Sequence, residues 1–205
     1  MTQGFPIAMP GQRIGLFGGS FDPAHEGHLR LTQTALQRFR LDRVWWLVTP
    51  GNPLKAHGPA PLEQRLAQAR EVLRGDPRVV VTDLEARLGT RLTADTIGSL
   101  VGLYPRVRFV WLMGSDNLVQ FSQWERWQEI AQMVPIGVMA RPGSRVAARF
   151  SKAATIMADR RLPEGQAGRL AEMTPPAWVM VNMPMTDASS SAIRAMRQKS
   201  GDGRG

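Results

Sequence analysis

The chain has 205 residues, of which 43% are hydrophobic and 21% are charged, as in an ordinary globular protein with one sizeable core. It contains no cysteine, which excludes disulfides and thiolate metal sites, and no apolar run approaches the length of a membrane span. The formal net charge of +9 leaves nucleic acids and small polyanions such as nucleotides open as partners. Because the basic residues are spread along the chain, the nucleotide is favoured.

The expected strands are six short apolar runs, at residues 14–17, 44–48, 79–81, 107–113, 136–139 and 178–181. Helical spacing is found between and after them, at residues 29–39, 62–73, 93–103, 118–133 and 189–197. Residues 84–92 have the pattern of an irregular connection, 146–158 are left open between helix and disorder, and no role is assigned to 144–176. Strands that alternate with helices predict an α/β fold, a doubly wound parallel sheet covered on both faces.

The turn after the first strand, Gly18 to His28, carries the densest signal in the chain. Gly18-Gly19 lacks Cβ atoms, so the backbone can bend sharply and a ligand can approach it. Asp22-Pro23 has the pattern of a helix cap and first helical position, where free N–H groups attract anions. His25 and His28 would share one helical face and suit phosphate oxygens. From spacing alone, a purely structural turn is an equal alternative.

This stretch resembles the signature of the HxGH nucleotidyltransferases, and its Gly-Ser-Phe-Asp-Pro form is similar to that of the bacterial nicotinate-mononucleotide adenylyltransferases. The resemblance implies a Rossmann-like nucleotidyltransferase fold in one domain over residues 13–197, with a flexible leader at 1–12 and a flexible tail at 198–205. It implies transfer of AMP from ATP to nicotinate mononucleotide in NAD biosynthesis, in the cytoplasm, with Mg²⁺ arriving on ATP. No dedicated metal site, nucleic acid or membrane partner is expected, and a homo-oligomer is left open.

The resemblance also assigns candidate site residues. Those expected to contact ATP are Gly18, Gly19, Ser20, Phe21, His25, His28, Gly114, Asp116, Ser190, Ser191 and Arg194. Those expected to contact the mononucleotide are Ser20, Phe21, Lys55, Thr93, Trp124 and Arg141. The catalytic set within these is His25, His28, Lys55 and Arg194. Each segment matches its family counterpart in order along the chain.

Simpler interpretations of the same residues stay open. Lys55 reads equally as a solvated loop residue, Thr93 and Asp116 as helix caps, and Trp124 as core packing. Leu92 stands where the family usually has a tyrosine before the threonine that Thr93 matches.

Two other functions are also kept as alternatives. One is another adenylyltransferase of the same superfamily, such as phosphopantetheine adenylyltransferase, which usually lacks the first histidine that His25 supplies here. The other is a basic nucleic-acid-binding module that keeps the fold without the reaction. The sequence does not decide between nicotinate and nicotinamide as the preferred ring.

Overall fold

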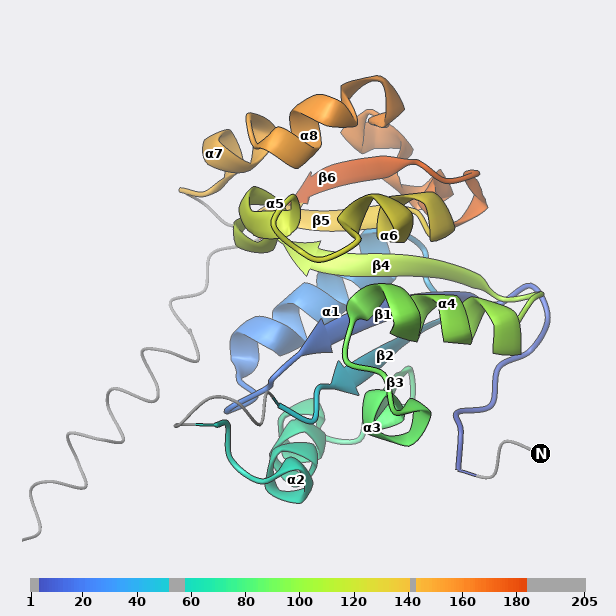
Figure 1. Cartoon of the computed structure of the whole chain (residues 1–205), viewed down its shortest axis with the longest axis vertical. Coiled ribbons are helices and arrows are strands. Elements are labelled where there is room, and N and C mark those ends of the chain that lie inside the picture. Colours follow the sequence, from blue (N-terminus) through green and yellow to red (C-terminus); the bar gives the residue numbers. More distant parts are fainter. Residues whose placement is uncertain (1–3, 52–57, 141–142, 184–205) are drawn as a thin grey trace, which may run out of the picture.

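A computed structural model describes residues 4–51, 58–140 and 143–183, and these form one parallel sheet of six strands in the order β3-β2-β1-β4-β5-β6 (Figure 1). The strands are β1 (Arg13–Gly19), β2 (Arg43–Val48), β3 (Val79–Thr82), β4 (Arg108–Gly114), β5 (Ile136–Ala140) and β6 (Trp178–Asn182). All neighbouring strands pair in parallel. The expected doubly wound α/β fold is therefore confirmed.

Helices cover both faces of the sheet. They are α1 (Glu26–Arg38), α2 (Leu62–Leu73), α3 (Leu84–Leu88), α4 (Thr93–Leu103), α5 (Ser115–Phe121), α6 (Trp127–Met133), α7 (Arg145–Arg149), α8 (Lys152–Ile156) and the 3₁₀ segments η1 (Ala158–Arg160) and η2 (Glu164–Glu172). Helices α4, α5 and α6 lie over one face, and α1, α2 and η2 pack on the other (Figure 1).

Trp45 and Trp46, adjacent on β2, show why the sequences of these strands are apolar at successive positions. Successive side chains of a strand point to opposite faces. Trp45 accordingly packs in the cluster under α4 and α6, whereas Trp46 packs in the cluster under α1 and α2. Both side chains are fully buried, as expected where a parallel sheet is covered on both sides.

Several expectations about individual segments need correction. Residues 84–92 are not wholly irregular, because α3 forms within them, and the open segment 146–158 contains α7 and α8. The boundary of the domain at residue 13, after a flexible leader, stays a prediction; in the preceding segment the Pro6 carbonyl accepts a hydrogen bond from the Tyr104 hydroxyl over 2.8 Å. The helix expected at 189–197 and the tail at 198–205 lie outside the described residues. None of the described helices is long and apolar enough to cross a membrane.

The strand order reverses direction at β1, which pairs with β2 on one side and with β4 on the other. The connections leaving β1 and β4 therefore run to opposite faces, and in open parallel sheets ligands bind at such a point, in a crevice outside the carboxyl ends of the strands. This edge of the sheet carries the Gly18 to His28 turn and the Gly114 to Asp116 segment. The fold places the two segments that the sequence assigned to ATP at the same crevice.

Candidate functional site

The glycine pair at the end of β1 is not the bend that the sequence suggested. Gly18 and Gly19 still belong to the strand. A Cβ on Gly18 would lie 2.6 Å from Cη2 of Trp111, so a glycine is needed there for the close approach of that indole. The left-handed residue of the turn is Phe21, with a φ of 47°.

Phe21 holds this unusual backbone conformation through its side chain. A bulky residue in the left-handed region is a genuine outlier and costs on the order of 1–3 kcal/mol. Its ring is 1% exposed and lies between Trp46, Phe17 and His28. The ring is therefore packing, and a contact between Phe21 and a ligand stays a prediction. Ser20, just before it, is exposed.

Helix α1 begins later than expected. Its N-cap is His25, and Asp22 does not cap it. The His25 Nδ1 atom accepts a hydrogen bond from the Gly27 N–H over 3.0 Å, and the His28 Nδ1 atom accepts one from the His25 N–H over 3.2 Å. The two histidines thus form a reciprocal capping box, with imidazole nitrogens in the place of the usual hydroxyl and carboxylate oxygens.

This capping box fixes the chemistry of both rings. Because each Nδ1 accepts a backbone hydrogen bond, the proton of each neutral imidazole belongs on Nε2. The ring centroids of His25 and His28 are 3.9 Å apart, and His25 is 7% exposed. The two rings lie at the positive end of a 13-residue helix, which is an arrangement that favours a phosphate group.

A buried arginine on α2 holds the two loops that border the crevice. Arg65 is 0% exposed, and its guanidinium donates to the carbonyls of Ala60, Ser20 and Thr49 at 2.7 Å each and to that of Pro50 at 3.2 Å. Burial lowers the pKa of this arginine. We call this arrangement the carbonyl clamp. The clamp ties the turn after β1 to the segment after β2.

Sequence reasoning missed the carbonyl clamp, although a signal was present. Arg65 lies in the same helical stripe as Leu66, Ala69 and Leu73, which are buried. A charged residue within an apolar stripe requires partners in the core.

The end of β4 supplies Gly114 and Asp116. Asp116 does not cap α5, because the N-cap is Gly114 and no side-chain capping bond forms. A Cβ on Gly114 would lie 2.4 Å from the Asp116 Oδ1 atom, so the glycine lets the carboxylate fold back over the strand end. Asp116 is exposed at this edge. A contact of Asp116 with ribose hydroxyls stays a prediction.

The candidates for the mononucleotide side lie on α4 and between α5 and α6. Thr93 is the first residue of α4, and the N-cap is Leu92, which makes no side-chain bond, so the capping interpretation of Thr93 is wrong. Trp124 is half-buried and meets the rings of Trp111 and Phe121 edge to face, at centroid distances of 6.3 and 5.5 Å. Part of the Trp124 surface is therefore open to a ligand.

The structure tests only some of the assigned residues. Five of them lie outside the described residues: Lys55, Arg141, Ser190, Ser191 and Arg194. Across residues 4–51, 58–140 and 143–183 no group of three or more histidine, aspartate and glutamate side chains is arranged to hold a metal ion.

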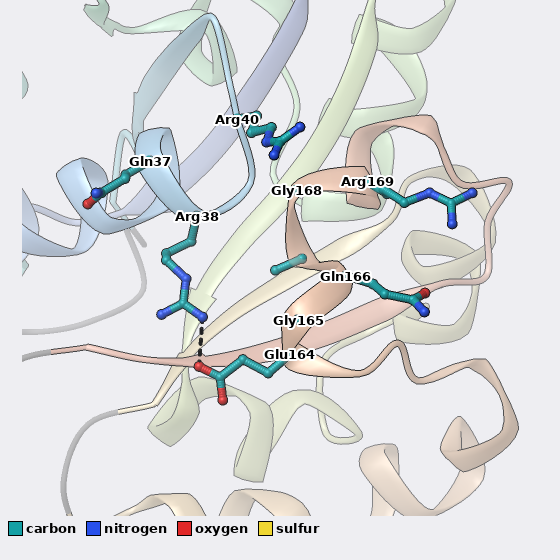
Figure 2. Close-up of a pocket in the computed structure, with 9 residues that line it drawn as sticks. Gln37, Arg38, Arg40, Glu164, Gly165, Gln166, Gly168 and Arg169 are labelled. Atoms are coloured by element: carbon teal, nitrogen blue, oxygen red, sulfur yellow. Dashed lines mark hydrogen bonds and ion pairs between the residues drawn. The ribbon is translucent and has the colours of Figure 1, made fainter.

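A hollow of about 470 Å³ lies between the C-terminal end of α1 and η2. Figure 2 shows its arginines: Arg38 bonds Glu164 over 2.8 Å, and Arg169 points away. The positive charges of this hollow do not converge on one point. It also lies at the opposite end of α1 from His25, about 20 Å along the helix. We therefore place the candidate site at the carboxyl edge of the sheet.

Comparisons with known proteins identify the family of this chain. Residues 16–196 match the model of the cytidylyltransferase-like family, so the chain is a nucleotidyltransferase of this class. It is 62% identical to a probable nicotinate-nucleotide adenylyltransferase of Ruegeria pomeroyi, over 95% of this chain and 91% of the relative. It is 57% identical to one of Roseobacter denitrificans, over 95% of this chain and 98% of the relative. The chain belongs to the nicotinate-nucleotide adenylyltransferase family, as the resemblance predicted.

A solved structure supports the same fold. The Plasmodium falciparum nicotinic acid mononucleotide adenylyltransferase, complexed with NaAD, matches with a TM-score of 0.68 at 17% identity. The match covers 90% of this chain and 83% of that one. At this identity the likeness concerns the fold.

Proposed function

We propose that the protein transfers AMP from ATP to nicotinate mononucleotide, forming nicotinate adenine dinucleotide and pyrophosphate. The observation that carries this is the His25–His28 capping box, whose rings lie 3.9 Å apart at the N-terminus of α1. The family to which the chain belongs supports the choice of reaction, and the switch point of the sheet supports the location.

The chemistry needs no protein nucleophile. A phosphate oxygen of the mononucleotide attacks the α-phosphorus of ATP, and the bond from that phosphorus to the bridging oxygen breaks as pyrophosphate leaves. Catalysis is then positioning and stabilisation of the charge that moves onto the leaving group. We assign this stabilisation to the Nε2–H groups of His25 and His28 and to the first N–H groups of α1.

Further contacts complete the proposed ATP site. Lys55, Ser191 and Arg194 hold the β- and γ-phosphates, Ser190 adds a hydroxyl, and Asp116 binds the ribose. Gly18 and Gly19 line the strand end where the nucleotide approaches. The exposure of Asp116 supports its part of this assignment.

The mononucleotide occupies the neighbouring part of the crevice. Trp124 stacks on the pyridine ring, Thr93 donates its hydroxyl, and Arg141 binds a further acidic group of the nucleotide. Ser20 and the backbone of Phe21 contribute from the β1 turn. The half-exposed indole of Trp124 supports the stacking role, because a buried one would have no surface to offer.

Mg²⁺ enters as part of the ATP substrate. Magnesium keeps several waters and prefers oxygen ligands, which phosphates supply. We further propose a cytoplasmic location, and homo-oligomerisation stays an open prediction.

A pyrophosphate-release assay with ATP and a panel of acceptors tests the function. Nicotinate mononucleotide should give the highest kcat/KM, ahead of nicotinamide mononucleotide and of phosphopantetheine. Preference for phosphopantetheine would identify the sister activity instead. Inactivity with every acceptor, together with salt-dependent binding to DNA or RNA in a gel shift, would favour the nucleic-acid-binding alternative.

A further inference from the structure

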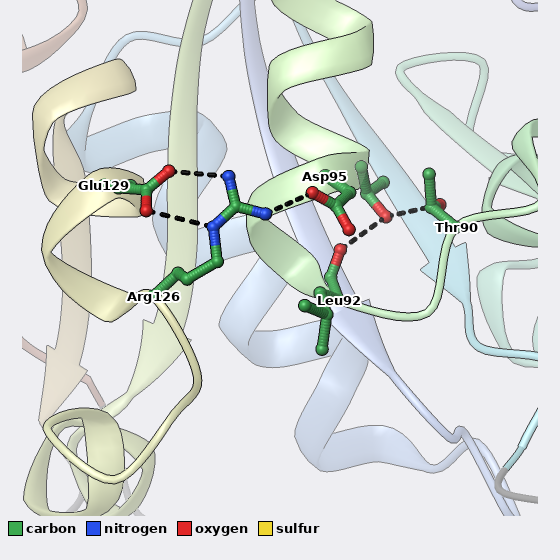
Figure 3. Close-up of polar contacts among 6 residues, drawn as sticks. Thr90, Leu92, Asp95, Arg126 and Glu129 are labelled. Carbon is green, nitrogen blue, oxygen red and sulfur yellow. Dashed lines mark hydrogen bonds and ion pairs between the residues drawn. The ribbon is translucent and has the colours of Figure 1, made fainter.

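Arg126 joins two helices through a three-membered ionic network (Figure 3). Its Nε and Nη2 atoms donate to the two carboxylate oxygens of Glu129 over 3.0 and 2.6 Å, and its Nη1 atom donates to Oδ1 of Asp95 over 2.5 Å. The hydrogen bonds that Arg126 donates to both carboxylates raise its pKa, and they lower the pKa of Glu129. Three guanidinium nitrogens and three carboxylate oxygens take part, so the guanidinium is held in one orientation.

Of the two ion pairs that Arg126 makes, one is local in the sequence and the other joins distant segments. Glu129 is three residues away on α6, so that pair is local. Asp95 is 31 residues away in the first turn of α4, so that pair joins separate segments of the chain. The bidentate contact with Glu129 orients the guanidinium, and the contact with Asp95 then fixes α4 against the start of α6.

These segments carry the two residues proposed for the mononucleotide. Thr93 lies two positions before Asp95, and Trp124 lies two positions before Arg126. Trp124 is anchored to the sheet through the edges of Trp111 and Phe121. The Asp95–Arg126 pair therefore links the segment that carries Thr93 to the segment that carries Trp124.

The first turn of α4 packs on the core through Ala94, which is 1% exposed, and the Asp95–Arg126 pair adds a polar connection to α6. Leu92 makes no side-chain cap, and the remaining bonds come from the opposite flank, where the Thr96 hydroxyl bonds the Leu92 carbonyl at 3.2 Å and the Thr90 hydroxyl at 2.7 Å (Figure 3). Arg126 itself has a φ of 57°, a left-handed conformation that persists only where surrounding contacts impose it. The network supplies those contacts.

We propose that Arg126 is a positioning residue that sets the separation of Thr93 and Trp124, and with it the fit of the mononucleotide. This inference rests on the proposed function. Arg126 touches no substrate and acts through the two segments that it joins. Removing it should therefore weaken the mononucleotide and leave ATP, which is bound by other elements, unaffected.

The test compares Arg126→Gln and Asp95→Asn in steady-state kinetics with both substrates. Each variant should raise KM for nicotinate mononucleotide about fivefold, the effect of an ion pair at the upper end of the exposed range, with kcat and KM for ATP nearly unchanged. The double variant should be no worse than either single one, because both remove the same bond. Glu129→Gln should have a smaller effect, since it leaves the Asp95 contact in place.

Salt and a matched pair supply the controls. The Arg126 and Asp95 side chains are 42% and 43% exposed, so added salt should raise KM for the mononucleotide in the wild type more than in Arg126→Gln. Arg38→Gln breaks a comparable long-range pair with Glu164 at the far end of α1 and should leave both KM values unchanged.

Three outcomes would overturn the proposal, and each can be told from the others. Wild-type turnover of nicotinate mononucleotide with an unchanged KM in Arg126→Gln and Asp95→Asn overturns the positioning role alone. An equal rise in KM for both substrates, with a lowered melting temperature, overturns it in favour of general stabilisation. Absence of wild-type turnover with this acceptor overturns the proposed function and this inference with it.

Discussion

Phe21 and Trp46 stack face to face, with ring centroids 4.6 Å apart and planes 12° apart. The pair joins the left-handed residue of the β1 turn to the centre of β2. Trp46 continues the connection, because its Nε1–H donates to the Thr32 hydroxyl over 2.8 Å, and that hydroxyl donates to the His28 carbonyl over 2.9 Å. The turn and the first turn of α1 are thus fixed to the same buried indole.

Replacing Thr32 by valine should destabilise the protein without changing the volume of the core. Thr32 is 0% exposed, so Thr32→Val leaves the indole N–H of Trp46 buried without its acceptor, at a cost of about 1–3 kcal/mol. Thermal melts measure this loss. Thr32→Ser keeps the hydroxyl and should retain most of that hydrogen bond, and an unchanged melting temperature in Thr32→Val would show that the bond contributes nothing.

The role of His25 in capping can be separated from its role in catalysis. His25→Ala removes the cap and should lower stability by about 1 kcal/mol, whereas asparagine is a good N-cap and His25→Asn should melt close to the wild type. Both variants should lose kcat by roughly a hundredfold or more, as when one charge-stabilising donor is removed. Near-normal kcat in His25→Asn would limit this histidine to capping the helix.

Glu85 predicts a dependence of stability on pH. Burial raises the pKa of this carboxyl, which is 6% exposed on α3, from 4.5 to about 7. The folded state therefore holds a proton that the unfolded chain releases near pH 4.5, so stability falls as the pH rises from about 4.5 to about 7. Above about pH 7 the free energy of unfolding should be lower by roughly 3 kcal/mol than it is below pH 4.5.

Glu85→Gln removes this titration and supplies its test. The variant should melt higher than the wild type at pH 8, and the difference should shrink toward pH 5. Melting curves across this pH range measure both. A difference that does not vary with pH would show that the carboxyl of Glu85 does not titrate in the folded state over this range.

Trp124→Ala should weaken nicotinate mononucleotide selectively. Stacking on a planar ring adds on the order of 1 kcal/mol beyond burial, so KM for the mononucleotide should rise several-fold while KM for ATP stays nearly constant. Trp124→Phe should keep much of the binding. If Trp124 serves only as packing, both KM values and the melting temperature should change together. Trp127→Phe is the matched control, because the Trp127 ring also contacts Phe121.

The fold was predictable because its signals are local. Six apolar runs alternating with helical spacing specify a parallel sheet, and the strand limits differ from the expected ones by only a few residues. The β1 end shows where this reasoning fails. Glycines suggested a bend and Asp22 suggested a cap, yet the bend is at Phe21 and the cap is His25, because packing on Trp46 and an imidazole acceptor outweigh residue preferences.

Long-range contacts were the part of the site that the sequence could not supply. No local pattern predicts that Arg126 meets Asp95, or that Arg65 meets the carbonyls of Ser20 and Thr49, since each depends on elements brought together by the sheet. The nearby residues His25 and His28 were identified correctly as a pair, although not as the capping box that fixes their protons.

The carbonyl clamp has a consequence for which substitutions this site can accept during evolution or engineering. Arg65 is the one residue that takes part through its side chain, and its partners accept through backbone carbonyls. The bonds to Arg65 therefore do not specify the side chains of Ser20, Thr49 and Ala60. As far as the carbonyl clamp is concerned, the turn after β1 and the segment after β2 can change in sequence while the bonds between them are kept. The carbonyl clamp depends on the residue at position 65. Lysine there would lack the planar guanidinium, which donates to several oxygens at once.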